Sequence, residues 1–160
     1  MANQTASLVD PITTIMRSYL VNVVNRGLNP PASATSEKYP IYEAQTPNSP
    51  DKCAILFETA KVKLGRYMYG GEVVYKHGCQ VQVRDPNYLE GHSYVNKLAR
   101  DLTEEETGPT LPFTLASPSG SGTYVIWSIE TPSGPLHLGI EPENRRHMWS
   151  LNLLIALNWN

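Results

Sequence analysis

The chain has 160 residues, of which 41% are hydrophobic and 18% are charged, as in a folded globular protein of one domain. Its formal charge of −2 excludes a broad basic field for holding nucleic acid or anionic lipid. No apolar run is long enough to cross a bilayer, and the opening MANQTASLVDPITT has no basic segment followed by an apolar core. We therefore expect a protein that is made in a cytoplasm and stays soluble there.

A first helix is predicted close to the N-terminus, because apolar residues recur there at the i, i+3, i+4, i+7 spacing of one helical face. Asp10-Pro11 is a start signal, and Gly27 is expected to supply a left-handed stop. We interpret the stripe as core, with a partner-binding surface as the alternative. The residues of the stripe are Ile12, Ile15, Met16, Tyr19, Leu20, Val23 and Val24.

Residues 29–52 form a segment rich in Pro, Ser and Asn whose prolines exclude a helix. Tyr39 to Ala44 is predicted to be a short edge strand, since Pro40 is tolerated near the start of such a strand. So long an irregular segment needs a reason. Docking on a neighbouring subunit is one explanation, and disorder of residues 29–38 is the other.

A strand is predicted at Cys53–Thr59, followed by a hairpin insertion over residues 65–77 that turns at Gly70-Gly71. Further on, Cys79, Val81 and Val83 alternate with polar residues and predict a half-buried strand. That polar set is Gln80, Gln82 and Arg84.

A second helix should follow at once, because Asp85 can cap it and Pro86 suits the first helical position. Its buried face is predicted to carry Tyr88, Gly91, Val95, Leu98, Ala99 and Leu102.

The rest of the chain is predicted to be β-rich, with strands at Tyr124–Glu130, Leu136–Glu141 and Arg146–Leu157 separated by turns containing Pro. The inward residues of the last strand should be His147, Trp149, Leu151, Leu153, Ile155 and Leu157. We expect an α+β fold: a mixed or antiparallel β-sheet with two main helices packed on one face, as a single domain over residues 1–160.

No arrangement of residues predicts an enzyme, a cofactor or a metal site. The four histidines lack metal-ligand spacing, and Cys53 and Cys79 are too few for structural zinc. We interpret both cysteines as buried thiols, with a disulfide as the alternative. A nucleophilic pair of His77 and Cys79 is conceivable, but no third group orients it, so a small hydrolase is the least favoured hypothesis.

Three local patterns carry a resemblance to a known family. TPNSPDKCAILFET, residues 46–59, is a Pro-x-x-Pro-Asp turn that leads into an apolar strand. VQVRDPNYLEGHSYVNKLARDL, residues 81–102, is a strand followed by Arg-Asp, an aromatic residue and a helix. PLHLGIEPENRRHMWSLNLLIAL, residues 135–157, has a turn with Asn-x-Arg and a strand with Ser-x-Asn. In this order they resemble the tail terminator proteins of long-tailed bacteriophages, also called minor capsid or tail completion proteins.

The resemblance implies a virion protein, assembled in the host cytoplasm, that forms a homohexameric ring on the tail tube, ends tube elongation and joins the tail to the head connector. The implied partners are further copies of the chain, the tail tube protein and the connector or stopper protein, with a sheath protein as a further candidate. DNA would pass through the ring without being recognised by sequence, which suits a mildly acidic subunit. Another neck protein, such as a head-completion or sheath-adaptor protein, or a non-viral protein-binding module is the alternative. The expected interface residues are Tyr42, Tyr67, Tyr69, Glu143, Asn144 and Arg145.

Overall fold

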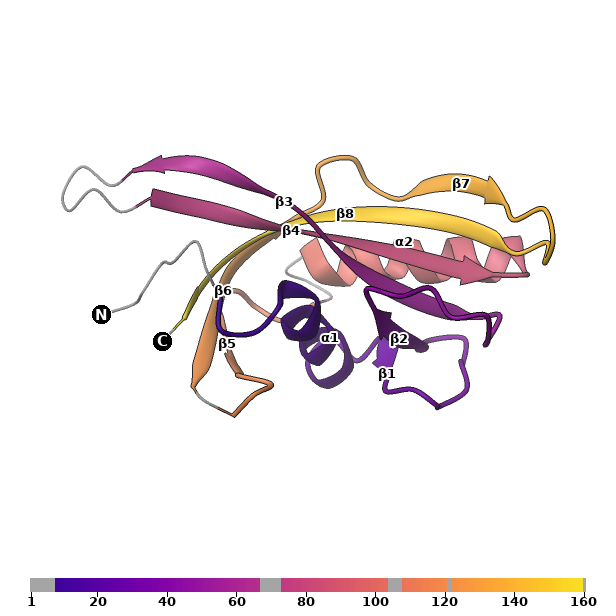
Figure 1. Ribbon diagram of the computed structural model, residues 1–160, viewed down its shortest axis with the longest axis horizontal. Helices are drawn as coiled ribbons and strands as arrows, with labels where there is room; N and C mark the ends of the chain where they lie inside the picture. The colour runs from indigo at the N-terminus through magenta and orange to yellow at the C-terminus, as the bar shows by residue number, and fades with distance from the viewer. Residues whose placement is uncertain (1–7, 67–72, 104–107, 121, 160) are drawn as a thin grey trace.

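The computed structural model describes residues 8–66, 73–103, 108–120 and 122–159, and it has one mixed β-sheet with two helices (Figure 1). The strands are ordered β1-β2-β3-β4-β8-β6-β5, with β7 paired to β8 off this path. The elements are α1 (Ile12–Asn22), β1 (Gly27–Leu28), β2 (Tyr39–Glu43), β3 (Cys53–Arg66), β4 (Val73–Asp85), α2 (Tyr88–Thr103), β5 (Phe113–Ala116), β6 (Thr123–Glu130), β7 (Leu136–Ile140) and β8 (His147–Trp159).

Both helices lie on the same face of the sheet, so the predicted α+β architecture is confirmed (Figure 1). Alternate residues of the central strands point toward the helices and are buried, among them Val81 on β4 and Leu151 on β8, which are register partners. The inward residues predicted for the last strand are buried from Trp149 to Leu157. In the described part of the chain, neither helix is long and apolar enough to cross a membrane.

The start of α1 differs from the prediction because Asp10 does not cap the helix. Its Oδ2 atom accepts hydrogen bonds from Ser117 Oγ at 2.7 Å and from Tyr124 OH at 2.8 Å, across the molecule. The left-handed residue after the helix is Asn25, with a φ of 62°, and not Gly27. Gly27 instead opens β1, where a Cβ atom would collide with the side chain of Ile41.

The second helix begins at Tyr88, two residues later than predicted. Asn87 caps it, because its side-chain oxygen accepts a hydrogen bond from the N–H of Glu90 at 3.2 Å. Asp85 binds the residue before the helix: its carboxylate accepts hydrogen bonds from the N–H of Asn87 at 2.7 Å and from the hydroxyl of Tyr39. The buried face also includes Tyr94 and Asp101, which we did not predict, whereas Tyr88 is exposed.

The strand predicted at the sheet edge is not an edge strand. β2 pairs in parallel with β3 on one side and with β1 on the other, so the two-residue β1 takes the edge. Tyr39 and Ile41 of β2 are therefore buried, as expected for a strand with neighbours on both sides. The loop over residues 29–38 is described, and the N–H of Thr35 donates to the carbonyl of Lys38 at 2.8 Å within it.

The predicted hairpin is part of a much longer one, since β3 and β4 pair along most of their length. β2 pairs with β3 only as far as Leu56, and β8 pairs with β4 only from His77 onward, among the described residues. Residues 61–66 and 73–76 consequently leave the sheet as a two-stranded ribbon, which we call the arm (Figure 1). The predicted turn at Gly70-Gly71 lies outside the described residues.

Candidate docking groove and arginine clamp

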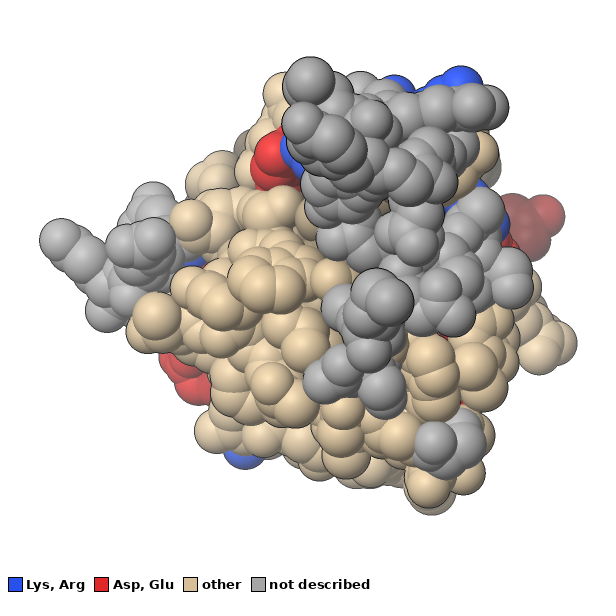
Figure 2. All heavy atoms as spheres, turned by 90° about the vertical axis from the view of Figure 1, so that its left-hand side faces the viewer, with Lys and Arg blue, Asp and Glu red and all other residues tan. Residues whose placement is uncertain are grey.

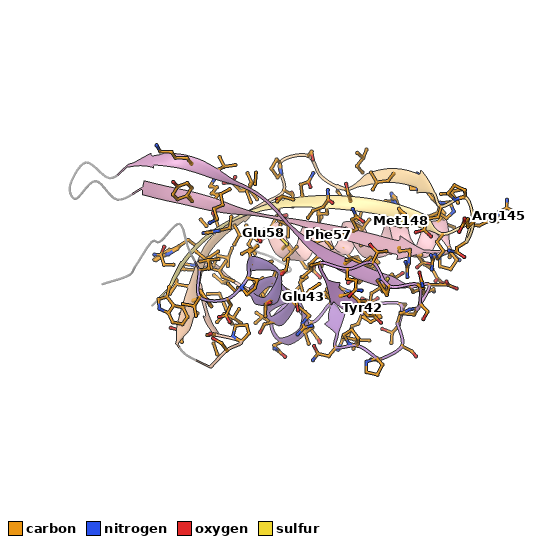
Figure 3. All side chains as sticks on the ribbon, viewed as in Figure 1. Tyr42, Glu43, Phe57, Glu58, Arg145 and Met148 are labelled. Carbon is orange, nitrogen blue, oxygen red and sulfur yellow. The ribbon has the colours of Figure 1, made fainter. Side chains whose placement is uncertain are left out.

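The structure distributes the predicted interface residues over different regions. Tyr42 lies half-buried on β2, while Glu143, Asn144 and Arg145 form an exposed turn between β7 and β8 at one end of the molecule (Figure 3). The turn is closed by the N–H of Arg145, which donates to the carbonyl of Glu141 at 3.0 Å. Tyr67 and Tyr69 lie outside the described residues.

Tyr42 lines an open groove of about 460 Å³ between two irregular segments of the chain. One wall comes from the loop after β1 and includes Pro31 and Ala34. The other wall comes from the loop after β2 and includes Pro50 and Asp51. We call this the proline groove. Its walls are mainly apolar, and the Asp51 side chain is 67% exposed at its margin.

Arg84, on β4, binds the loop that forms the second wall, the one with Pro50 and Asp51. We expected this residue on the polar face of its strand, but its relative exposure is 0%. Its Nη1 atom donates to the carbonyl of Pro47 at 2.7 Å, and its Nη2 atom donates to the carbonyl of Pro50 at 2.6 Å. Hydrogen bonds from a charged donor are stronger than neutral ones, so the guanidinium fixes both prolines to the sheet.

Arg146, the residue just before β8, binds the same wall and is also buried. Its Nη1 atom donates to the carbonyl of Asn48 at 2.9 Å and pairs with Asp51 Oδ1 at 3.2 Å. Its Nε atom donates to Glu141 Oε2 at 2.7 Å. We call Arg84 and Arg146, with the loop over residues 46–51 that they bind, the arginine clamp.

The clamp covers part of the sheet face that lies opposite the helices. Cys53 is the register partner of Arg84, and both it and Ile55 are fully buried on that face. Burial raises the pKa of the Cys53 thiol to about 11, and the nearby guanidinium of Arg84 offsets only part of this effect. The thiol is therefore protonated at neutral pH, and both cysteines are free and buried, as predicted.

The alternation of the strand could not predict the clamp, because it indicates only which residues share a face. The missed signal was the apolar character of Cys53 and Ile55, which alternate with the core residues Ala54 and Leu56 and therefore occupy the opposite face. A strand that is apolar on both faces is covered on both faces.

The Cys–His pair considered for a hydrolase does not form an accessible site. Cys79 is fully buried, and burial raises the pKa of its thiol to about 12. Burial, together with the charge of Lys61, lowers the pKa of His77. Among the described residues, no group of three or more His, Cys, Asp or Glu side chains is placed to hold a metal ion.

Two histidines that are distant in sequence do meet. His137 Nε2 lies 3.1 Å from His147 Nδ1, a hydrogen-bonding distance, and both rings pack against Trp149 and Tyr88. The contact ties β7 to β8 and to the start of α2. On β7, Leu136, Leu138 and Ile140 are exposed by 60%, 51% and 55%.

No family model matches this sequence, and no curated protein matches it significantly.

Proposed function

We propose that the chain is a structural subunit of a phage tail, which forms a ring on the tail tube, stops tube elongation and joins the tail to the head connector. The observation that carries the proposal is the arginine clamp. The three patterns behind the resemblance lie far apart in sequence, yet each supplies part of this one cluster around two buried arginines: Pro47 and Pro50, then Arg84, then Arg146. The three segments that carry the resemblance thus form one structural unit, and this supports the proposal.

The surfaces left uncovered by the fold suit an assembled subunit. The apolar side chains on β7 lie at the surface, and β7 pairs only with β8 in the described part of the sheet. Seen from the end that carries the arm, the described surface below the arm consists mostly of residues other than Lys, Arg, Asp and Glu (Figure 2). Depletion of charge is typical of the centre of protein interfaces.

The experiment is an elongation assay in which purified protein is added to tail-tube subunits during polymerisation. We expect tubes to stop growing and to carry a cap of the protein at one end. Tubes that reach the same length distribution with a large excess of the protein would rule out a terminator. A capped tube whose length is unchanged would instead favour a different neck protein.

The assay has a matched pair of variants. Arg145→Glu reverses an exposed charge on the β7–β8 turn, where we propose contact with a neighbouring subunit. The control, Ser93→Glu, places a carboxylate at an exposed position of α2. We expect the first variant to weaken ring formation or capping, and the second to behave as the unmodified protein.

A further inference from the structure

The arm carries side chains that are exposed in the described part of the chain. Lys61, Val62 and Lys63 are all exposed, and Val62, an apolar residue, is 41% exposed. Within the described residues, neither outer edge of the ribbon pairs with another strand. A two-stranded ribbon alone is only marginally stable in water, so the arm is a candidate for stabilisation by a partner.

The arm is basic, although the chain as a whole is acidic. The arm contains Lys61, Lys63, Arg66 and Lys76 and no acidic residue, which gives +4 with His excluded. Lys76 pairs with Glu130 of the same subunit, which leaves a charge of +3 on the rest of the arm. The chain carries −2, so the residues outside the arm carry −6. The arm is therefore attracted to the rest of another copy.

The proline groove is prepared to receive a partner. Its wall over residues 49–52 is fixed by the two arginines of the clamp, whose bonds to Pro50 and Asp51 are 2.6 and 3.2 Å long. A wall held in this way loses little conformational freedom when a partner binds. Asp51 pairs with Arg146 through Oδ1, and Lys52, which also lines the groove, pairs with Glu90. The Asp51 side chain is nevertheless 67% exposed, and its carboxylate complements the lysines of the arm.

The two surfaces lie in opposite halves of the molecule. The arm extends from one end of the long axis, while β2 and Tyr42, which lines the groove, lie toward the other end (Figures 1 and 3). One subunit cannot fill its own groove with its own arm. Contact between two different patches is heterologous, and repetition of such a contact gives a ring when the rotation closes.

We propose that the arm of one copy docks in the proline groove of the next, so that subunits associate head to tail. This deepens the proposed function, on which the closure into a ring at the tube end rests. The lysines of the arm approach Asp51, and the apolar surface around Val62 packs on Tyr42 and Pro50. The occupant of the groove is thus a second copy of this chain.

Cysteine cross-linking tests the contact, because both native cysteines are buried. Val62→Cys places a thiol on the arm, and Ala34→Cys places one in the groove. Under mild oxidation, the double variant should give a ladder of covalent multimers on a non-reducing gel. An equal mixture of the two single variants should stop at dimers, since each copy then has one accessible thiol. The control pairs Val62→Cys with Leu89→Cys, an exposed position on α2, and should stay monomeric.

Charge gives a second measurement. Lys63→Glu should raise the apparent dissociation constant of self-association about fivefold, as expected for the loss of one ion pair at an interface margin. Added salt should also raise the dissociation constant of the unmodified protein, because it screens the same charges. An absent ladder, or equal cross-linking through Leu89→Cys, overturns the proposal. Dimers from Val62→Cys alone would indicate a symmetric arm-to-arm contact and also overturn it.

The two proposals fail separately. If the ladder forms but tubes elongate normally, head-to-tail docking stands and the terminator function is wrong. If tubes are capped but no ladder forms, the function stands and the arm binds elsewhere.

Discussion

Replacing Arg84 should destabilise the protein more than its position on the polar side of a strand would suggest. The side chain is fully buried and donates two charge-assisted hydrogen bonds, to the carbonyls of Pro47 and Pro50. Each such bond contributes about 1.5 to 3 kcal/mol, and the burial of the guanidinium offsets part of the total. We therefore expect Arg84→Ala to lower the free energy of unfolding by about 3 to 5 kcal/mol.

Arg84→Lys separates the role of geometry from that of charge. An ammonium group lacks the planar fork that reaches two carbonyls at once, so we expect a loss of about 2 kcal/mol. Arg145→Ala is the matched control, because this side chain is exposed on a turn, and its effect should stay within about 0.5 kcal/mol.

The measurement is urea denaturation at neutral pH, with the slope m compared among the variants, together with amide hydrogen exchange over residues 46–52. Faster exchange in this loop should accompany the loss of stability in Arg84→Ala, since the wall of the groove is then released. If Arg84→Ala loses less than about 1 kcal/mol and the loop exchanges at the unmodified rate, the clamp does not hold the loop and our reasoning is wrong.

Three further predictions concern the core and its charges. Leu151→Asp should prevent folding, as seen by circular dichroism, because it places an unpaired charge against the helices; Asn152→Asp, on the opposite and exposed face, should fold normally. Cys53→Ala and Cys79→Ala should each cost about 1 kcal/mol in thermal or urea unfolding, and a disulfide-linked band on a non-reducing gel would contradict two buried thiols. Burial favours the protonated form of Asp10, but hydrogen bonds to its carboxylate outweigh this effect and lower its pKa below 3.8. The ionised carboxylate should therefore stabilise the fold above pH 3.8, and this stabilisation should be lost as the pH falls through the folded pKa. Asp10→Asn should reduce this loss in acid unfolding curves.

The sequence alone determined the elements with clear periodicity. Alternation fixed the register of β8, with Trp149 and Leu151 inward and Asn152 outward, because a slip of one residue would expose the whole apolar set. The stripe from Ile12 to Leu20 likewise determined α1 and its buried face. The α+β class followed from two such helices and a series of strands.

Only the tertiary structure decided how separate segments meet. Arg84 has the same local pattern as an exposed residue, and it is buried because a loop more than thirty residues earlier in the chain, at Pro47 and Pro50, folds over it. The structure places β1, and not the predicted β2, at the edge of the sheet for the same reason, since strand order depends on contacts between distant residues. Local periodicity records which face of an element is apolar, but what covers the other face depends on the path of the whole chain. The proline groove and the arginine clamp belong to that second kind of information.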